Sequence, residues 1–334
     1  MFDSLKSRRG LLAAGVVLVA AQALPFAAIA QSGYPTRPIR FLVGFAPGGS
    51  ADNVARVVAA EMSKNLGQQI VIENKTGASA NIATQALLAA APDGYTILFA
   101  GLSLATNPAM IDNVGYNPNK DLVMVSQITS LPVVSLTRAD SSLNNLQDVI
   151  ATAKAKNGTL KFGSGGLGTS SHLAPELMSR AAGFKYTHVP YRGGAPALQA
   201  LFSGETDLMF DLMTPTLKSN ADAGKIKFLG VMQKEATPLL PGVKPAGAQG
   251  VPEAAMMRSW QGVAVRNGTS PEIIAKLHQS VVTALKNKEV VDKLAAIGTE
   301  VQTSAKPADF QKLYEDELAR WTALIKAAGI KAEQ

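Results

Sequence analysis

The chain has no cysteine, only three histidines and few aromatic residues among its 334 positions. The lack of cysteine excludes disulfide bonds, thiolate metal sites, a cysteine nucleophile and a lipid anchor on an N-terminal cysteine. His172, His188 and His278 are scattered, without metal-ligand spacing or an acidic cluster beside them, so we expect no metal site. No block of lysine and arginine follows residue 30, and we therefore expect no nucleic-acid partner.

Long apolar runs are also missing beyond the N-terminus, where no segment approaches the ~20 residues of a membrane-spanning helix. Residues 1–10 are basic, residues 11–21 are apolar, and Ala28 and Ala30 place small side chains before Gln31. This order is typical of a cleaved secretory signal, so we expect residues 1–30 to be removed and the protein to reach the periplasm. The segment SRRGLL at 7–12 resembles a twin-arginine signal, and both export routes stay open. An uncleaved anchor is the alternative, which Gln22 and Pro25 disfavour because they interrupt the apolar stretch.

The expected mature chain, residues 31–334, has 304 residues, which favours two lobes over one small core. Loss of residues 1–30 removes three basic residues and one acidic residue, so the formal net charge falls from +7 to +5. A mild positive excess suits an anionic small ligand through long-range steering, although many soluble proteins carry such a charge for other reasons.

Strand and helix patterns alternate along the whole mature chain. The first series predicts strands at 39–45, 69–73 and 95–100, and helices at 50–66 and 80–91. A second series predicts strands at 133–137, 160–162, 187–189, 208–210 and 227–231, and helices at 146–156, 170–182, 195–202 and 215–223. A strand at 261–265 and helices at 271–285, 288–296 and 307–327 close the chain. This order is typical of parallel sheets covered by helices on both faces.

We therefore predict an α/β fold in two lobes, each a mostly parallel sheet flanked by helices. The simplest packing returns the C-terminal part to the first lobe, so lobe 1 comprises residues 31–131 and 259–334, and lobe 2 comprises residues 132–258. The chain then crosses between the lobes near residues 129–133 and 257–262, and two crossings make the hinge of a clamshell.

A first glycine-rich loop, FAPGGSAD at residues 45–52, joins a predicted strand to a predicted helix. Glycines let backbone N–H groups approach a ligand, and the helix start adds unpaired donors and a positive dipole end that favour an anion. A plain tight turn with Ser50 or Asp52 as helix cap is the alternative for this loop alone.

A second glycine-rich loop, GSGGLGTSS at residues 163–171, also leads from a strand to a helix. Its glycines satisfy G-x-G-x-x-G, but the following strand leads into Pro190-Tyr191-Arg192 rather than the acid that a dinucleotide ribose requires. We therefore expect no dinucleotide and no other cofactor. Thr169, Ser170 and Ser171 can instead offer hydroxyl groups to a carboxylate.

Two such loops, one in each lobe, predict a shared ligand site, because ligands of open α/β sheets bind at the carboxyl ends of the strands. Other strand ends that should line the cleft are residues 101–103, 191–193 and 211–213. The candidate ligand-binding residues are Phe45, Pro47, Gly48, Gly49, Ser50, Asp52, Leu102, Ser103, Ser164, Gly168, Thr169, Ser170, His172, Tyr191 and Asp211.

An enzymatic role is disfavoured. The chain has no G-x-S-x-G nucleophile motif. Ser170 and Ser171 adjoin His172, but neighbouring residues on a helix point in different directions and do not readily pair as nucleophile and base. His172 is expected to cap or to pack. Asp211 either meets a ligand amine or hydroxyl, or anchors its own loop.

Several segments together resemble the Bug family, the periplasmic solute receptors of tripartite tricarboxylate transporters. The matching segments are YPTRPIR at 34–40, PGGSADNVAR at 47–56, ENKTGA at 73–78, PDGYT at 92–96, SHLAPEL at 171–177, VPYRGGAPA at 189–197, GETD at 204–207 and FD at 210–211. They cover most of residues 34–265 in register, so the resemblance is specific.

The resemblance implies a type II binding-protein clamshell without enzymatic activity. It implies a ligand carboxylate held by the two loops, often with ordered waters, at Gly48, Gly49, Ser50, Thr169, Ser170 and Asp211. The expected partners are a small organic acid, which is a dicarboxylate, a tricarboxylate or an aromatic acid, and a membrane permease. A sensor kinase is the alternative membrane partner, and we expect a monomer.

The chain departs from the family pattern where it has FDLM at 210–213, since the family usually has a longer polar stretch there. Leu102, Leu167, Leu212 and Met213 would make the cleft more apolar than a citrate or aspartate site needs. This departure favours a ligand with an apolar or aromatic body, unless these side chains point into the core.

Overall fold

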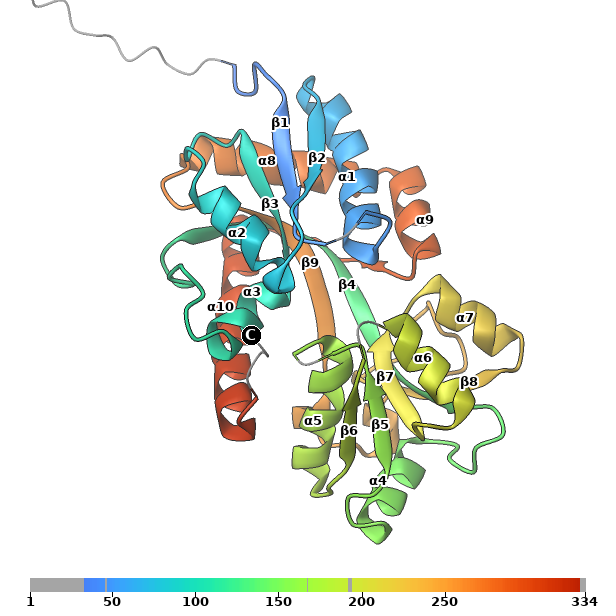
Figure 1. Ribbon diagram of the computed structural model, residues 1–334. Coiled ribbons are helices and arrows are strands. Elements are labelled where there is room, and N and C mark those ends of the chain that lie inside the picture. Colours follow the sequence, from blue (N-terminus) through green and yellow to red (C-terminus); the bar gives the residue numbers. More distant parts are fainter. Residues whose placement is uncertain (1–32, 46, 167, 192–193, 331–334) are drawn as a thin grey trace, which may run out of the picture. The chain divides into compact units, whose positions relative to one another are not determined.

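The computed structural model describes residues 33–45, 47–166, 168–191 and 194–330 (Figure 1). The expected signal sequence, residues 1–30, and the candidate positions Ala46, Leu167, Arg192 and Gly193 lie outside the described residues. Within these ranges, none of the helices combines the length and the apolar character that crossing a membrane requires.

The first group of strands forms a parallel sheet edge, as the βαβαβ pattern predicts. The strands are β1 (Ile39–Val43), β2 (Ile70–Asn74) and β3 (Thr96–Gly101), in the order β2-β1-β3. The helices that follow β1 and β2 are α1 (Ser50–Leu66) and α2 (Asn81–Leu88). β1 and β3 are buried almost throughout, which explains their nearly continuous apolar sequence.

The second group repeats this arrangement farther along the chain. Its parallel strands are β5 (Lys161–Ser164), β6 (Thr187–Pro190) and β7 (Leu208–Leu212), in the order β7-β5-β6. The accompanying helices are α4 (Leu146–Ala155), α5 (Ser170–Ala182), α6 (Gly194–Ser203) and α7 (Pro215–Asp222). The predicted two-lobed α/β fold is therefore confirmed.

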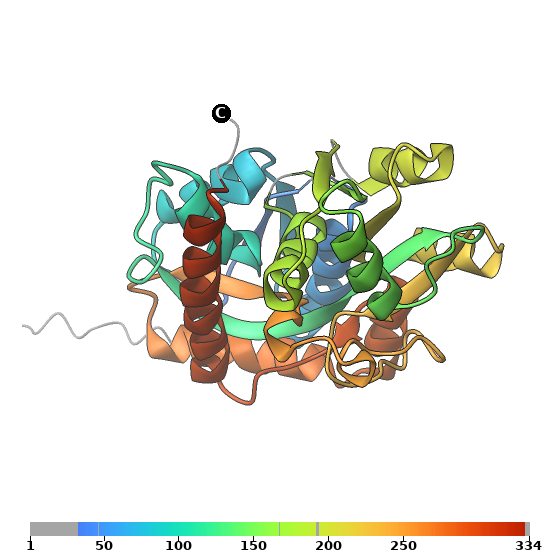
Figure 2. The same ribbon diagram turned by 90° about the horizontal axis from the view of Figure 1, so that it is seen from below.

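One long strand, β4 (Leu122–Arg138), belongs to both groups (Figures 1 and 2). Up to Pro132 it pairs antiparallel with β9 (Arg258–Arg266), which in turn pairs with β3. From Val133 onward it pairs antiparallel with β7 and with β8 (Ile226–Val231). The partner of β4 thus changes between Pro132 and Val133, inside the first predicted crossing.

The second connection between the lobes lies directly opposite the first. The backbone N–H of Met257 donates to the carbonyl of Met232 at 2.7 Å, and Arg258 then begins β9 opposite Pro132. The Arg258 guanidinium pairs with Glu300, at the start of the short strand β10 (Glu300–Val301). The two connections between the lobes therefore lie side by side, in the neighbouring strands β4 and β9. The residue boundaries of the lobes stay a prediction.

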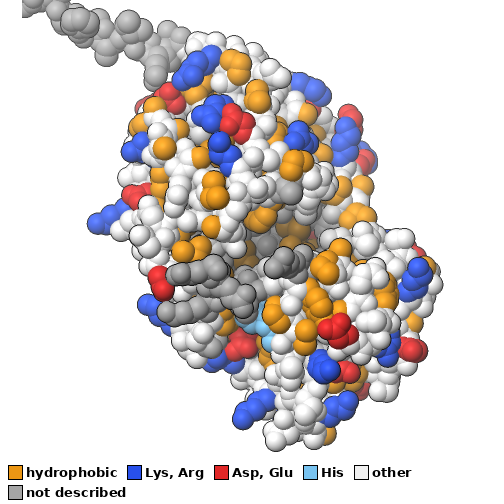
Figure 3. Space-filling model, viewed as in Figure 1, with side chains coloured by type: hydrophobic (Ala, Val, Ile, Leu, Met, Phe, Trp, Pro, Cys, Tyr) orange, Lys and Arg blue, Asp and Glu red, His pale blue; other side chains and the backbone are white. Residues whose placement is uncertain are grey.

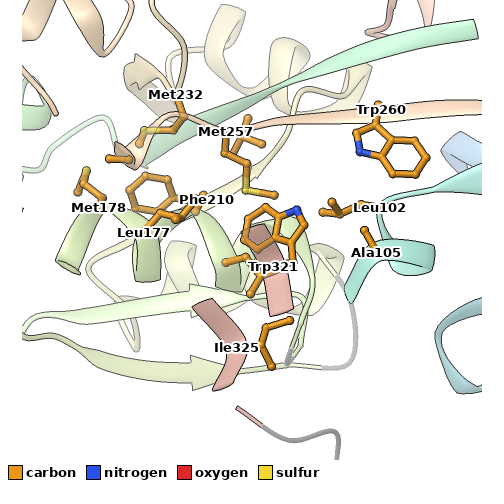
Figure 4. Packing of buried hydrophobic residues seen from close by; sticks show 14 of the residues in the cluster. Leu102, Ala105, Leu177, Met178, Phe210, Met232, Met257, Trp260, Trp321 and Ile325 are labelled. Atoms are coloured by element: carbon orange, nitrogen blue, oxygen red, sulfur yellow. The ribbon is translucent and has the colours of Figure 1, made fainter. Parts of the chain in front are cut away.

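The C-terminal helices pack on α1, α3 and β4. Helices α8 (Pro271–Ala284) and α9 (Lys288–Ala296) contact α1, and α10 (Pro307–Ala328) contacts β4 and α3 (Ser103–Met110). The far end of α10 also reaches lobe 2, because Arg180 of α5 donates to the carbonyl of Ala327 at 3.2 Å. Trp321 and Ile325 of α10 share one buried cluster with Met257 and Phe210 (Figure 4).

Candidate functional site

A cavity of about 350 Å³ is lined by residues from both lobes. Lobe 1 contributes from the β1–α1 loop, the end of β3, α3 and β9, and lobe 2 contributes from the β5–α5 loop, α6 and the end of β7. Figure 3 shows the surface hollowed between the two lobes, with hydrophobic side chains around the hollow. The volume lies at the small end of the range for ligand pockets, so it suits a small molecule.

Four helices begin at this cavity. The first residues of α1, α3, α5 and α6, which are Ser50, Ser103, Ser170 and Gly194, all line it. Each helix start carries roughly half a positive charge and unpaired backbone N–H groups. Their convergence makes the cavity receptive to an anion.

The starts of α1, α3 and α5 differ from those of four other helices in the described chain. No side chain of the N-cap residue bonds to the first turn at Gly49, Leu102 or Thr169. By contrast, the N-cap side chains of α4, α7, α8 and α9 accept such hydrogen bonds, at Asn145, Thr214, Ser270 and Asn287. The N–H groups that face the cavity are therefore left without side-chain caps and can bind a ligand.

Asp52 organises the first loop from behind. Its carboxylate accepts from the N–H of Gly48 at 2.9 Å, from Arg56 Nε at 2.8 Å and from Asn74 Nδ2 at 2.9 Å. Burial alone would raise the pKa of Asp52, but the hydrogen bonds from Arg56, Gly48 and Asn74 outweigh it and lower the pKa to about 2. Asp52 is thus a fixed anion whose oxygens are already engaged in holding the shape of the loop.

Hydroxyl groups hold the second loop in the same manner. Ser171 Oγ accepts from the N–H of Gly165 at 2.8 Å, and Thr169 Oγ1 donates to the carbonyl of Gly166 at 2.7 Å. The two hydroxyls also bond to each other at 2.8 Å. Ser170 Oγ makes no such bond within the described chain. Of the three hydroxyls that the sequence offered to a ligand, that of Ser170 is the one not used to build the loop.

Two histidines support this loop from the core. The rings of His172 and His188 stack with centroids 4.0 Å apart, and His172 Nδ1 accepts from the N–H of Gly168 at 3.1 Å. His188 Nε2 is hydrogen-bonded to Ser164 Oγ at 2.6 Å. Burial, with a smaller contribution from His188, lowers the pKa of His172 to about 3, so the ring is neutral and packs, as one of the two sequence interpretations held.

The two lobes lie close together at Gly168. Its φ of 70° lies in the left-handed region, and a Cβ built on it would be 2.2 Å from Met110 Cε of α3. The backbone conformation favours glycine here, and a larger side chain would have to displace the flexible end of Met110.

Three buried polar atoms on residues that line the cavity have no hydrogen-bond partner among the described residues. They are Ser50 Oγ, Asn107 Oδ1 and Trp260 Nε1, all from lobe 1. Buried polar atoms are paired in the great majority of cases, so a water or a ligand group is the expected partner of these three atoms.

Asp211 is the penultimate residue of β7, at the opposite wall. One of its oxygens accepts from the N–H of Leu212 at 2.8 Å. Burial raises the pKa of Asp211 to about 6, and the bond from Leu212 opposes only part of that rise. Among the described residues that line the cavity there is no lysine, arginine or histidine, and none of the described ion pairs includes Asp211.

The structure brings eight of the candidate residues together at the cavity. These are Phe45, Ser50, Leu102, Ser103, Gly168, Thr169, Ser170 and Asp211. The other seven candidates do not line it. Pro47, Gly48 and Gly49 form an exposed turn, Asp52, Ser164 and His172 lie behind the loops, and the Tyr191 ring packs on the lobe 2 core. No group of residues that could hold a metal ion occurs within the described ranges.

The cavity residues that sequence reasoning missed come mostly from α3 and β9. They include Thr106, Asn107, Met110, Ser259, Trp260 and Gln261. A third missed region is the turn before α2, where Ala78, Ser79 and Ala80 all have positive φ. Ser79 lines the cavity, and its carbonyl accepts from Asn107 Nδ2 at 2.9 Å. Three successive non-glycine residues in this conformation are strained, which is typical of a functional site.

Much of the remaining wall is apolar. Phe45, Phe99, Leu102, Met110, Leu212 and Trp260 line the cavity. Leu102 and Leu212 therefore lie where the departure from the family pattern placed them. Met213 does not, because it is buried in the lobe 2 core with Val134 and Leu198.

Comparison with known proteins gives consistent results. Residues 54–330 match the model of the tripartite tricarboxylate transporter family receptor. The periplasmic binding protein BugD is 30% identical, with a TM-score of 0.75 over 90% of this chain and 100% of its own. MatC from Rhodopseudomonas palustris, solved with malate, is 32% identical, with a TM-score of 0.72 over 87% of this chain and 100% of its own. An R. palustris protein solved with adipate is 33% identical, with a TM-score of 0.77 over 89% of this chain and 99% of its own.

Proposed function

Since this chain belongs to the tripartite tricarboxylate transporter receptor family, we propose that it binds a small organic carboxylate between its lobes and delivers it to a membrane transporter. The observation that carries this proposal is the convergence of uncapped helix starts on one cavity. The ligands seen in MatC and in the adipate-bound relative are also organic acids.

The ligand carboxylate would lie between the starts of α1 and α5. Ser50 and Ser170 are the hydroxyl donors left open there, one in each lobe. Each hydrogen bond to a charged group contributes about 1.5–3 kcal/mol, and each helix dipole adds roughly 0.3–1 kcal/mol. Three such bonds and the two helix dipoles therefore supply about 5–11 kcal/mol, from which the costs of closure and ordering are subtracted.

Binding would be coupled to movement about the two strand connections. We infer that residues 129–133 and 257–262 act as the hinge, because β4 exchanges partners at Pro132 and β9 begins beside it. We also infer that residues 1–30 are removed on export. The contact between α10 and α5 spans both lobes and must adjust when they separate.

The site offers no support for hydrolysis by Ser170. His172 follows two residues later, but its Nδ1 accepts from Gly168 and its ring stacks on His188. A general base must reach the proton that it removes, and this imidazole is already committed to the loop. The receptor function is therefore favoured over an α/β enzyme.

A thermal-shift screen of mono-, di- and tricarboxylates, aromatic acids included, tests the proposal. An acid present at 100 times its Kd should stabilise the protein by about 2.7 kcal/mol. Ser170→Ala should weaken the binding of any acid that is found, whereas Ser219→Ala, on an exposed part of α7, is the matched control. Midpoint shifts from non-acidic compounds alone would contradict the carboxylate assignment.

A further inference from the structure

The cavity has more acceptors than a dicarboxylate site would need. Four helix starts supply roughly half a positive charge each, about two in all, and the Asp211 carboxylate removes one. No lysine, arginine or histidine among the described lining residues adds to this charge. Counted over the described groups alone, the remaining charge of about +1 matches one carboxylate.

Asn107 provides an acceptor with a defined orientation. Its Nδ2 donates to the carbonyl of Ser79 at 2.9 Å, and a carbonyl can only accept, so the amide cannot be turned around. The left-handed residues 78–80 hold that carbonyl in place. The other amide atom, Oδ1, is buried and has no partner in the described chain. A ligand that satisfies Asn107 must therefore donate a hydrogen bond.

Asp211 supplies a second acceptor from lobe 2. Its Oδ1 accepts from Leu212, whereas Oδ2 lies beside Gly194, where a Cβ would be only 2.6 Å away. Glycine at the start of α6 thus keeps the space around this oxygen open. Because the described ion pairs do not include Asp211, a donor on the ligand is the natural partner for the carboxylate.

Between these polar groups the wall is apolar, through Phe99, Leu102, Met110 and Leu212. We infer that the ligand is a monocarboxylate with an apolar body and a hydroxyl or ammonium group, which Asn107 Oδ1 or Asp211 accepts. The inference rests on the proposed function, because it takes the carboxylate at the helix starts as given. It names a class that excludes dicarboxylates without a donor, such as adipate.

A matched series with one carbon skeleton tests this inference by isothermal titration calorimetry. Hexanoate, 6-hydroxyhexanoate, 6-aminohexanoate and adipate differ only in the terminal group, and 2-hydroxyhexanoate moves the donor next to the carboxylate. Phenylacetate and 4-hydroxyphenylacetate form an aromatic pair. We expect at least one donor-bearing acid to bind 10-fold or more tightly than its parent and than adipate, because sites built around a hydrogen bond reject analogues that lack it. The hydroxy and amino members show which donor is used.

Asn107→Leu and Asp211→Leu remove the two acceptors while keeping the size of the side chain. In one of these variants, the preference for the donor-bearing acid over its parent should fall below about 3-fold. The control Asp140→Asn, which changes an exposed carboxylate, should keep that preference. If neither leucine variant folds, the ligand series with the unmodified protein still decides. Tightest binding of adipate, or equal binding of parent and donor-bearing acids, overturns the inference and leaves the receptor function intact. Binding of no acid at all overturns both.

Discussion

Replacement of Asp211 by asparagine is expected to stabilise the ligand-free protein near neutral pH. Burial raises the pKa of this carboxyl group to about 6, and the hydrogen bond from Leu212 offsets only part of the effect. Since the described ion pairs do not include Asp211, ionisation in the folded state costs free energy that a neutral amide of the same shape does not incur.

The size of the effect follows from the linkage between protonation and folding. The folded-state pKa lies about two units above the ordinary value of 3.8, so the folded protein holds this proton more tightly than the unfolded chain does. The stability that the group contributes is fully present below about pH 4 and is lost as the pH rises through about 6. At 1.36 kcal/mol per unit the loss near pH 7.5 is about 3 kcal/mol. Asp211→Asn should recover about 1–3 kcal/mol of it, or roughly 2–6 °C in Tm.

Scanning calorimetry at about pH 4 and about pH 7.5 measures this effect. The Tm of Asp211→Asn should exceed that of the unmodified protein at the higher pH and equal it at the lower. Groups that titrate in both proteins cancel in the difference. Asp140→Asn, which removes an exposed carboxylate, should show no such pH-dependent gap. An equal gap at both pH values, or a loss of stability near pH 7.5, would refute a buried and uncompensated carboxylate.

Three further predictions concern other parts of the structure. Ser170→Ala should weaken the tightest-binding acid of the screen about 10-fold in calorimetry, and unchanged affinity would move the carboxylate away from α5. Gly168→Ala should weaken it at least as much, because the new methyl meets Met110, and adding Met110→Ala should restore part of the loss. Trp321→Ala should lower the free energy of unfolding by about 3–5 kcal/mol in urea titration, and a loss below about 1 kcal/mol would contradict its core position.

The sequence predicts most elements well where local signals mark both ends. Helices α1, α5 and α9 have the predicted bounds, and α1 and α5 end at Gly67 and Gly183 in the left-handed conformation. The first half of β4 was missed because its sequence, LVMVSQITSLP, includes buried polar residues that obscure an apolar strand. Thr129 is tolerated there because its hydroxyl bonds to Gln261 across the strand pair at 2.9 Å. Only the paired strand reveals that partner.

The candidate site could be predicted in part for a similar reason. Glycine-rich loops after strands are local signals, so Ser50, Gly168 and Ser170 were found. Asn107 lies in α3, a helix of eight residues that contains Pro108 and reads as a loop. Trp260 belongs to β9, which reaches the cavity only because the chain returns to lobe 1 after a long excursion. Such residues join the site through topology, which local patterns do not encode.

The same features that form the site also destabilise the ligand-free protein. Without side-chain caps, the helix start at Thr169 forgoes about 1 kcal/mol and that at Gly49 about a few tenths of a kcal/mol relative to capped ones. Asp211 adds the ionisation cost, and Ser79 holds a strained backbone conformation. A ligand that donates to Asp211 and accepts from the helix starts relieves the first two of these costs. The acid should therefore raise the Tm of the unmodified protein more than the Tm of a variant in which helix caps have been introduced and Asp211 has been replaced by a neutral residue. This difference separates a preorganised receptor site from general stabilisation by anions.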